Sequence, residues 1–87
     1  MKKQEIIDEI EGKISKYLLW HIGQTHYPDS RKYEHMKEGK TITYWKHWET
    51  DSLSDAQDIE SYFINKGMKE GTGGDLHSRE TVYVYIF

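Results

Sequence analysis

The chain has 87 residues, of which 36% are hydrophobic and 14% aromatic, and its formal net charge is −3 at pH 7. This length suits a single domain with one core. The chain contains no cysteine, which excludes disulfides, thiolate metal sites and cysteine nucleophiles. The acidic balance disfavours a dedicated nucleic-acid-binding domain, because such domains are usually basic.

The amino-terminal segment carries a charge every few residues and lacks the apolar stretch of a signal peptide. No apolar run approaches the ~20 residues that a helix needs to cross a bilayer. We therefore expect a protein without a membrane span. Together with the lack of cysteine, these features lead us to expect a cytoplasmic location.

The first predicted element is a helix over Lys2–Lys16, in which an apolar residue recurs every fourth position at Ile6, Ile10 and Ile14. The mostly apolar run Tyr17–Gly23 ends in glycine, which is typical of a buried strand. Pro28 then predicts the start of a second helix, because proline is favoured in a first turn. This helix is expected to run to Lys37 and to stop at Gly39.

The second half of the chain continues the alternation of strands and helices. Thr41–Trp48 is rich in β-branched and aromatic residues and predicts a second strand. Either Ser52 or Ser54 is expected to cap a third helix, whose apolar stripe consists of Ala56, Ile59 and Phe63. Thr81–Phe87 predicts a final strand. Gly71–Gly74 lacks the lysine and Ser/Thr of a phosphate-binding loop, so we expect an ordinary loop there.

The predicted order α-β-α-β-α-β gives one α/β (α+β) domain over residues 1–87, with a three-stranded sheet flanked by helices. Side chains alternate between the two faces of a strand. In the last strand one face would carry valine and isoleucine, and the other would carry Tyr83, Tyr85 and Phe87. Both faces are apolar, so we expect helices on both sides of the sheet.

A polar pattern follows the first predicted strand. His21-Ile22-Gly23-Gln24-Thr25 is followed by Arg31, eight residues after Gly23, and by His35, twelve after it. An arginine and a histidine four residues apart project from one face of a helix. A guanidinium grips two phosphate oxygens at once, and an imidazole moves a proton near neutral pH. Glu60 on the third predicted helix would ligate one Mg²⁺. These residue types suit phosphodiester hydrolysis.

This pattern, over roughly Trp20–Phe87, resembles the GIY-YIG nuclease family, in which a strand ending Tyr-Ile-Gly precedes a helix with arginine and histidine, and a later helix carries a glutamate. The resemblance implies a GIY-YIG-like fold and a metal-dependent nuclease that hydrolyses DNA phosphodiesters. Nucleic acid would be the partner, and Glu60 would bind Mg²⁺ or Mn²⁺. The implied catalytic residues are Arg31, His35, His21 and Glu60. The implied phosphate or substrate contacts are Gly23, Arg31, Lys32 and Tyr83.

The sequence departs from the family at both tyrosines. The first motif, Gly-Ile-Tyr on a strand, is replaced by Gly12-Lys13-Ile14 in a predicted helix. His21 stands where the second motif has tyrosine. Tyr83 or Tyr85 would fill the vacated space if the last strand takes the place of the missing first strand. Two hypotheses follow: a nuclease with a degenerate site, or a non-catalytic binding or structural module that keeps the fold without the chemistry.

Two further patterns are less specific. Trp45 and Trp48 lie three apart on a predicted strand and would point to opposite faces. We expect one in the core, while the other either covers the core or offers a base-stacking platform. The histidines at positions 21, 26, 47 and 77 lack the spacing of a zinc site, so no structural zinc is expected.

Overall fold

The computed structural model describes residues 1–71, 76–77 and 79–87. Its helices are α1 (Lys3–Lys13), α2 (Pro28–Lys37) and α3 (Leu53–Asn65). Its strands are β1 (His21–Thr25), β2 (Lys46–Glu49), β3 (Lys69–Glu70) and β4 (Tyr83–Ile86). A single 3-10 turn, η1 (Tyr17–Leu19), leads into β1. The predicted glycine-rich loop lies outside the described residues except for Gly71.

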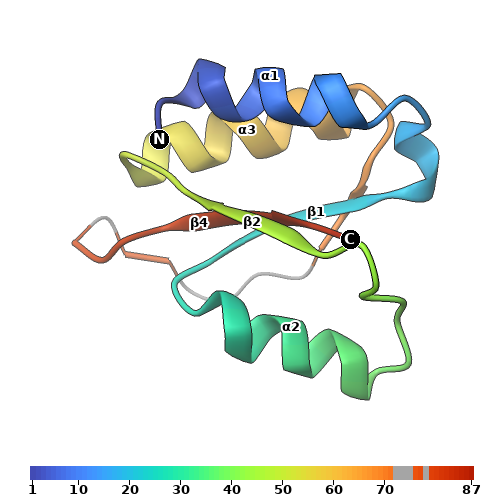
Figure 1. Cartoon of the computed structure of the whole chain (residues 1–87). Coiled ribbons are helices and arrows are strands. Elements are labelled where there is room, and N and C mark those ends of the chain that lie inside the picture. Colours follow the sequence, from blue (N-terminus) through green and yellow to red (C-terminus); the bar gives the residue numbers. More distant parts are fainter. Residues whose placement is uncertain (72–75, 78) are drawn as a thin grey trace.

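The described strands form one sheet in the order β2-β4-β1-β3. β4 runs antiparallel to both β1 and β2, whereas β3 runs parallel to β1. α1 and α3 cover one face of the sheet and α2 covers the other (Figure 1). The mixed α/β class with helices on both faces is thus confirmed. No helix among the described residues is long and apolar enough to cross a membrane.

The sheet has one strand more than the three that the sequence predicts. β3 is only two residues long, and backbone hydrogen bonds hold it beside β1. The N–H of Lys69 donates to Trp20 O at 2.9 Å, and the N–H of Gly71 donates to Ile22 O. Neither residue of β3 is apolar. A strand this short, without a hydrophobic pattern, gives no signal in the sequence.

The predicted strand over Tyr17–Gly23 is wrong in its first half. The ladder with β4 reaches only as far as His21, whose N–H and C=O both bond to Phe87, at 2.7 and 3.1 Å. The residues before His21 lie beyond that ladder, and the N–H of Trp20 instead closes a turn onto Tyr17 O at 3.0 Å. Leu19, in this turn, is 73% exposed. The first half of the apolar run is therefore not a strand, whereas His21–Gly23 belongs to β1.

Pairing also sets the length of β2. Lys46–Glu49 lies opposite Tyr83–Ile86, so the strand is shorter than the predicted Thr41–Trp48. The residues before it turn back, with the N–H of Trp45 bonded to Ile42 O at 3.1 Å. α1 likewise ends three residues early, because Ile14 is extended rather than helical.

The sequence signals for the ends of helices agree with the structure better than those for the ends of strands. α2 begins at Pro28 and ends at Lys37 as predicted, and Gly39 follows it with φ +85°. The Ser52 hydroxyl accepts the N–H of Asp55 at 3.0 Å, so Ser52, not Ser54, caps α3. Glycine is favoured at position 39 because the left-handed region costs it nothing.

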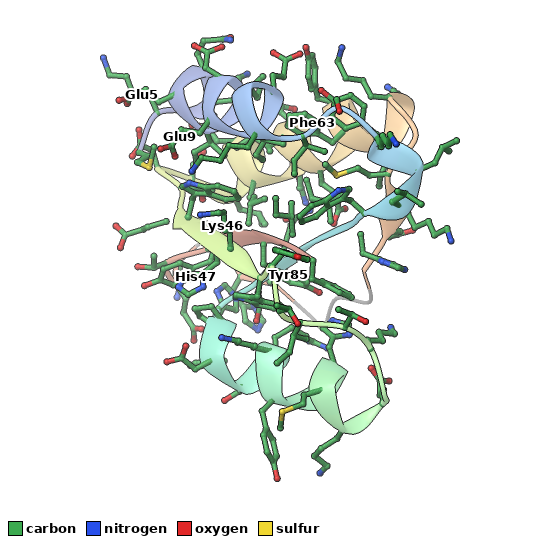
Figure 2. The ribbon with its side chains drawn as sticks, turned by 45° about the vertical axis from the view of Figure 1, so that its right-hand side comes forward. Glu5, Glu9, Lys46, His47, Phe63 and Tyr85 are labelled. Carbon is green, nitrogen blue, oxygen red and sulfur yellow. The ribbon has the colours of Figure 1, made fainter. Side chains whose placement is uncertain are left out.

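The two faces of β4 divide the core by chemistry. Val82, Val84 and Ile86 pack with aliphatic residues of α1 and with Ile59 and Phe63 of α3. Tyr85 points the other way, towards α2 (Figure 2), where its ring contacts His35. Phe87 contacts the same imidazole. This alternation confirms the prediction for the last strand.

The two tryptophans follow the same division and point to opposite faces, as predicted. Trp48 is buried in the aliphatic core, and its indole N–H donates to Glu9. Trp45 precedes β2 and stacks on Tyr85, with ring centroids 4.6 Å apart and planes 10° apart. Trp45 therefore covers the aromatic side of the core.

Two glycines provide a matched test of this packing. A Cβ at position 23 would lie 2.4 Å from the hydroxyl of Tyr85, whereas one at position 12 would meet nothing within 4 Å. We expect Gly23→Ala to lower the free energy of unfolding by about 1–3 kcal/mol, because the buried ring cannot move without overpacking. Gly12→Ala, inside α1, should raise it by about 0.5–1 kcal/mol. Urea unfolding measures both, and equal stability of the two variants would contradict the close approach.

Candidate functional site

The polar residues of the aromatic face gather around Tyr85. This side chain is 0% exposed, and antiparallel pairing places it opposite Gly23 of β1. Because Gly23 has no side chain, the phenol ring lies directly against the β1 backbone. Burial raises the pKa of Tyr85 to about 12, so the hydroxyl stays protonated at neutral pH.

His35 of α2 holds this hydroxyl. The imidazole is 1% exposed, and its Nε2 lies 3.2 Å from Tyr85 Oη. Its Nδ1 lies 3.3 Å from a Glu38 carboxylate oxygen and 3.4 Å from Lys40 Nζ. The ring packs on Phe87 with centroids 4.4 Å apart. Burial, with the nearby charge of Lys40, lowers the pKa of His35.

The neutral imidazole has two arrangements in this setting. If Nδ1–H donates to Glu38, Nε2 accepts the hydroxyl hydrogen of Tyr85. If Lys40 donates to Nδ1, Nε2–H donates to the phenol oxygen instead. Whichever ring nitrogen carries the proton, the other nitrogen therefore has a hydrogen-bond donor beside it. His35 and Tyr85 therefore form a hydrogen-bonded pair. Glu38 and Lys40, near the surface, determine which of the two is the donor.

Arg31 lies one turn before His35 on α2. Its guanidinium Nη1 is 3.1 Å from Glu34 Oε2, a partner on the same helix whose side chain is exposed. The charge of Arg31 lowers the pKa of Tyr85 and so opposes the effect of burial. Lys32 lines a hollow beside β2, together with Trp45 and His47. Of these two cations, Arg31 is the one whose charge acts on Tyr85.

Glu60 lies on α3, across the sheet from α2 (Figure 1). It accepts a hydrogen bond of 3.1 Å from Gln24 Nε2 on β1. Burial raises the pKa of Glu60, and Glu70 adds to the effect, while the bond from Gln24 opposes it. The charge of Glu60 also raises the pKa of Tyr85. Its influence thus reaches the other face, although among the described residues no ion pair joins it to Arg31.

β1 organises the two halves of the site. Successive residues of a strand point to opposite faces. Gly23 therefore faces Tyr85 and α2, while Gln24 faces α3 and Glu60. Arg31 and His35 lie together on one side of this strand, and Glu60 lies on the other. The phenol of Tyr85 is the group that responds to the charges of both sides.

The remaining predicted residues take other positions. His21 stacks on Phe87, with centroids 4.8 Å apart and planes 7° apart, and burial and Lys40 lower its pKa. Tyr83 meets the ring of His47 edge-on at 5.9 Å, beside β2. Of the two tyrosines that the sequence left open, Tyr85 is the one in contact with His35.

Gln24 and Lys40 are not among the site residues that the sequence predicts. A local feature of the sequence could have identified each residue. Gln24 directly follows Gly23, so the alternation of a strand turns its side chain to the opposite face. Lys40 directly follows the glycine that ends α2. Gln24 is 6% exposed, and its carbonyl oxygen has no hydrogen-bond partner among the described residues. A buried amide oxygen without a partner is costly and requires an explanation.

A divalent cation at this corner would depend on Glu60. The carboxylate is a hard oxygen donor, but the Gln24 atom that faces it is the amide nitrogen, and the Gln24 carbonyl oxygen is buried without a partner among the described residues. Mg²⁺ binds through one or two carboxylates and keeps several waters. Among the described residues there is no group of three His, Cys, Asp or Glu placed to hold a metal. Glu60 would therefore be the residue that holds such a cation, with water completing its coordination.

Comparison with known proteins gives no match to any family model, to any curated protein or to any solved structure. The interpretation of the site therefore depends on the geometry and chemistry described above.

The buried imidazole predicts a pH-dependent stability. Because the pKa of His35 in the folded protein is lowered from 6.5, the unfolded chain binds the proton first as pH falls. The free energy of unfolding should therefore fall as pH decreases from 7.5 to 6, and His21 should add to the effect in the same direction. The raised pKa of Glu60 acts oppositely, at pH values closer to 4.5.

Urea unfolding at several pH values measures this slope, which should be reduced in His35→Phe. His47→Gln, which removes an exposed imidazole, is the matched control. An NMR titration of the wild-type imidazoles gives the same information without a variant. A His35 midpoint at or above 6.5 would contradict the prediction.

Proposed function

We propose that this domain is a divergent GIY-YIG-like nuclease that hydrolyses DNA phosphodiesters with a divalent cation. The observation that carries the proposal is the buried hydroxyl of Tyr85. It is hydrogen-bonded to His35, lies against Gly23, and feels the charges of both Arg31 and Glu60. Burial of this kind, with charge partners that shift a pKa, is typical of functional sites.

Strand pairing supports a role for Tyr85 in place of the missing first-motif tyrosine. β4 lies antiparallel beside β1, the strand that carries the second motif. Its register sets Tyr85 opposite Gly23 of that motif. In this proposal the last strand would supply the tyrosine that takes the place of the missing first-motif residue.

Each residue has a role that its surroundings permit. Arg31 would bind a phosphate oxygen, because its partner Glu34 is exposed and exchangeable. Tyr85 and His35 would hold or move a proton at the phenol oxygen, since either direction of their hydrogen bond is available. The aromatic rings of Trp45 and Phe87 shield this pair from water.

Glu60, with Gln24 beside it, would hold Mg²⁺ or Mn²⁺. When bound, such a cation neutralises phosphate charge and acidifies its bound water. The raised pKa of Glu60 is consistent with a carboxylate whose charge is poorly balanced by the residues of the chain alone.

The second candidate function is a binding or structural module without catalysis. It is favoured by the closure of His35, which is 1% exposed. It is favoured also by His21, which stacks on Phe87 where the family has a tyrosine. In that case Arg31 would still bind phosphate, but no group would activate water.

Cleavage of single-stranded or plasmid DNA tests the proposal. The wild type should require Mg²⁺ or Mn²⁺, and Arg31→Ala should lose about 10²–10³-fold in rate, as is typical for one preorganised charge contact. The chain's other arginine, Arg79, is exposed, and Arg79→Ala is the matched control. Glu60→Gln should abolish cleavage, whereas Asp58→Asn on the exposed face of α3 should leave it unchanged.

The tyrosines provide a second test. Tyr85→Phe keeps the ring but removes the hydroxyl that His35 holds, so it should lose most of the rate. His21→Tyr restores the second-motif residue and should preserve or raise the rate. If no protein cleaves, and millimolar Mg²⁺ leaves the amide NMR signals around Glu60 and Gln24 unmoved, the non-catalytic module is the correct function.

A further inference from the structure

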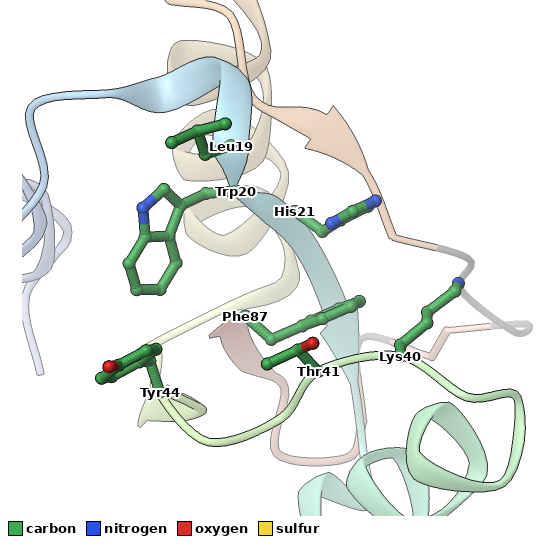
Figure 3. Close-up of a pocket in the computed structure, with 7 residues that line it drawn as sticks. All are labelled: Leu19, Trp20, His21, Lys40, Thr41, Tyr44 and Phe87. Carbon is green, nitrogen blue, oxygen red and sulfur yellow. The ribbon is translucent and has the colours of Figure 1, made fainter.

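A pocket of about 440 Å³ opens between the start of β1 and the segment that follows α2. Aromatic rings dominate its lining: Trp20 and Tyr44 lie on one side, His21 on the other, and Phe87 between them (Figure 3). Pockets of this size, largely apolar with few polar groups, are typical of small-ligand sites.

The rings of the lining are packed against one another in two pairs. His21 and Phe87 are stacked in parallel, and Trp20 and Tyr44 lie 6.3 Å apart at 52°. Tyr44 is 68% exposed, so its face is open to a ligand. Stacking on such faces is favourable for any planar aromatic ring.

Lys40 supplies a positive charge to the pocket, and none of the described lining side chains is acidic. Its partner Glu38 lies outside the lining, with a carboxylate oxygen 3.7 Å from Lys40 Nζ, and is exposed, so a bound anion can replace it. Lys40 and Lys69 both lower the pKa of His21, which shows that their fields overlap at this ring. The pocket thus suits a planar aromatic group that carries an anion.

Lys40 also connects the pocket to the site around Tyr85. Its Nζ lies 3.4 Å from His35 Nδ1 and 5.8 Å from the centroid of Phe87. Phe87 packs on His21 in the pocket and on His35 in the site. A ligand that fills the pocket would therefore place an attached anion next to the residues proposed to handle phosphate.

We propose that this pocket holds one unpaired base of a nucleic-acid strand, stacked on the exposed face of Tyr44, with an adjoining phosphate on Lys40. This inference rests on the proposed function and specifies its substrate as single-stranded or locally unpaired. A base within a duplex is covered by its neighbours and must leave the stack to enter a pocket. Stacking of this kind tolerates any base, because each has a π-face.

Fluorescence anisotropy of a labelled single-stranded 12-mer, in EDTA to prevent cleavage, tests the pocket. Tyr44→Ala should weaken binding by about 5- to 100-fold, the range expected for one lost base stack. Tyr33→Ala removes an equally accessible tyrosine from α2 and should bind as the wild type does. Trp20 fluorescence should be quenched by the unlabelled 12-mer.

The charge contact has its own control. Lys40→Gln should reduce the slope of log affinity against log salt by about 0.7, the value for one phosphate of a single strand. Lys37→Gln, an exposed lysine of α2 that lies over Tyr33, should leave the slope unchanged. Circular dichroism of each variant confirms that the fold is retained.

The outcomes separate this inference from the proposed function. Binding that depends on Arg31 but not on Tyr44 or Lys40 would overturn the pocket and leave the proposed function standing. If the 12-mer does not bind at all, the pocket inference is overturned, while the proposed function is decided separately by the cleavage test with Mg²⁺ or Mn²⁺. Concentration-dependent dimerisation that Tyr44→Ala abolishes would instead assign the pocket to contacts between copies of the chain. Tighter binding of a duplex than of the single strand would overturn the unpaired base.

Discussion

The close approach of the Tyr85 ring to Gly23 is the constraint on which the rest of the structure depends. β4 lies between β1 and β2, so its side chains fill the centre of both faces of the sheet. On the α2 side a full phenol ring must fit against the β1 backbone, and only glycine leaves room for it. The ring in turn supports Trp45, Phe87 and the imidazole of His35.

This packing fixes the position of a hydroxyl that a looser core would leave mobile. Because Tyr85 is fully buried, the packing of its ring fixes the position of the hydroxyl oxygen. His35 is confined in the same layer and meets that oxygen through Nε2. A buried hydrogen bond is stronger than one at the surface, since little water competes for it. The packing of side chains on one face of the sheet therefore fixes the positions of the Tyr85 hydroxyl and the His35 imidazole relative to each other.

The same layer links the two recognition features that we propose. Phe87 is shared between the aromatic pocket and the imidazole of His35, and Lys40 lies at the boundary of the two. Across β1, the Gln24 amide donates to the Glu60 carboxylate under α3. A bound strand would thus meet stacking rings and cations on one side of β1, with the Glu60 carboxylate on the other.

The sequence by itself determined the elements whose signals are local. Pro28 and Gly39 predicted both ends of α2, and the alternation in Thr81–Phe87 separated the two faces of β4. The start of α3 was predicted at Ser52 or Ser54, and the structure selects Ser52. The sequence also predicted Arg31 and His35 on one helix and Glu60 on another.

Only the tertiary structure decided the features that depend on a partner far along the chain. The ends of β1 and β2 are set by the reach of β4, β3 exists only because it bonds to the edge of β1, and Tyr85 rather than Tyr83 meets His35 because of register. Backbone pairing joins residues far apart along the chain, so the residues of one strand alone do not show where its ladder with another strand ends.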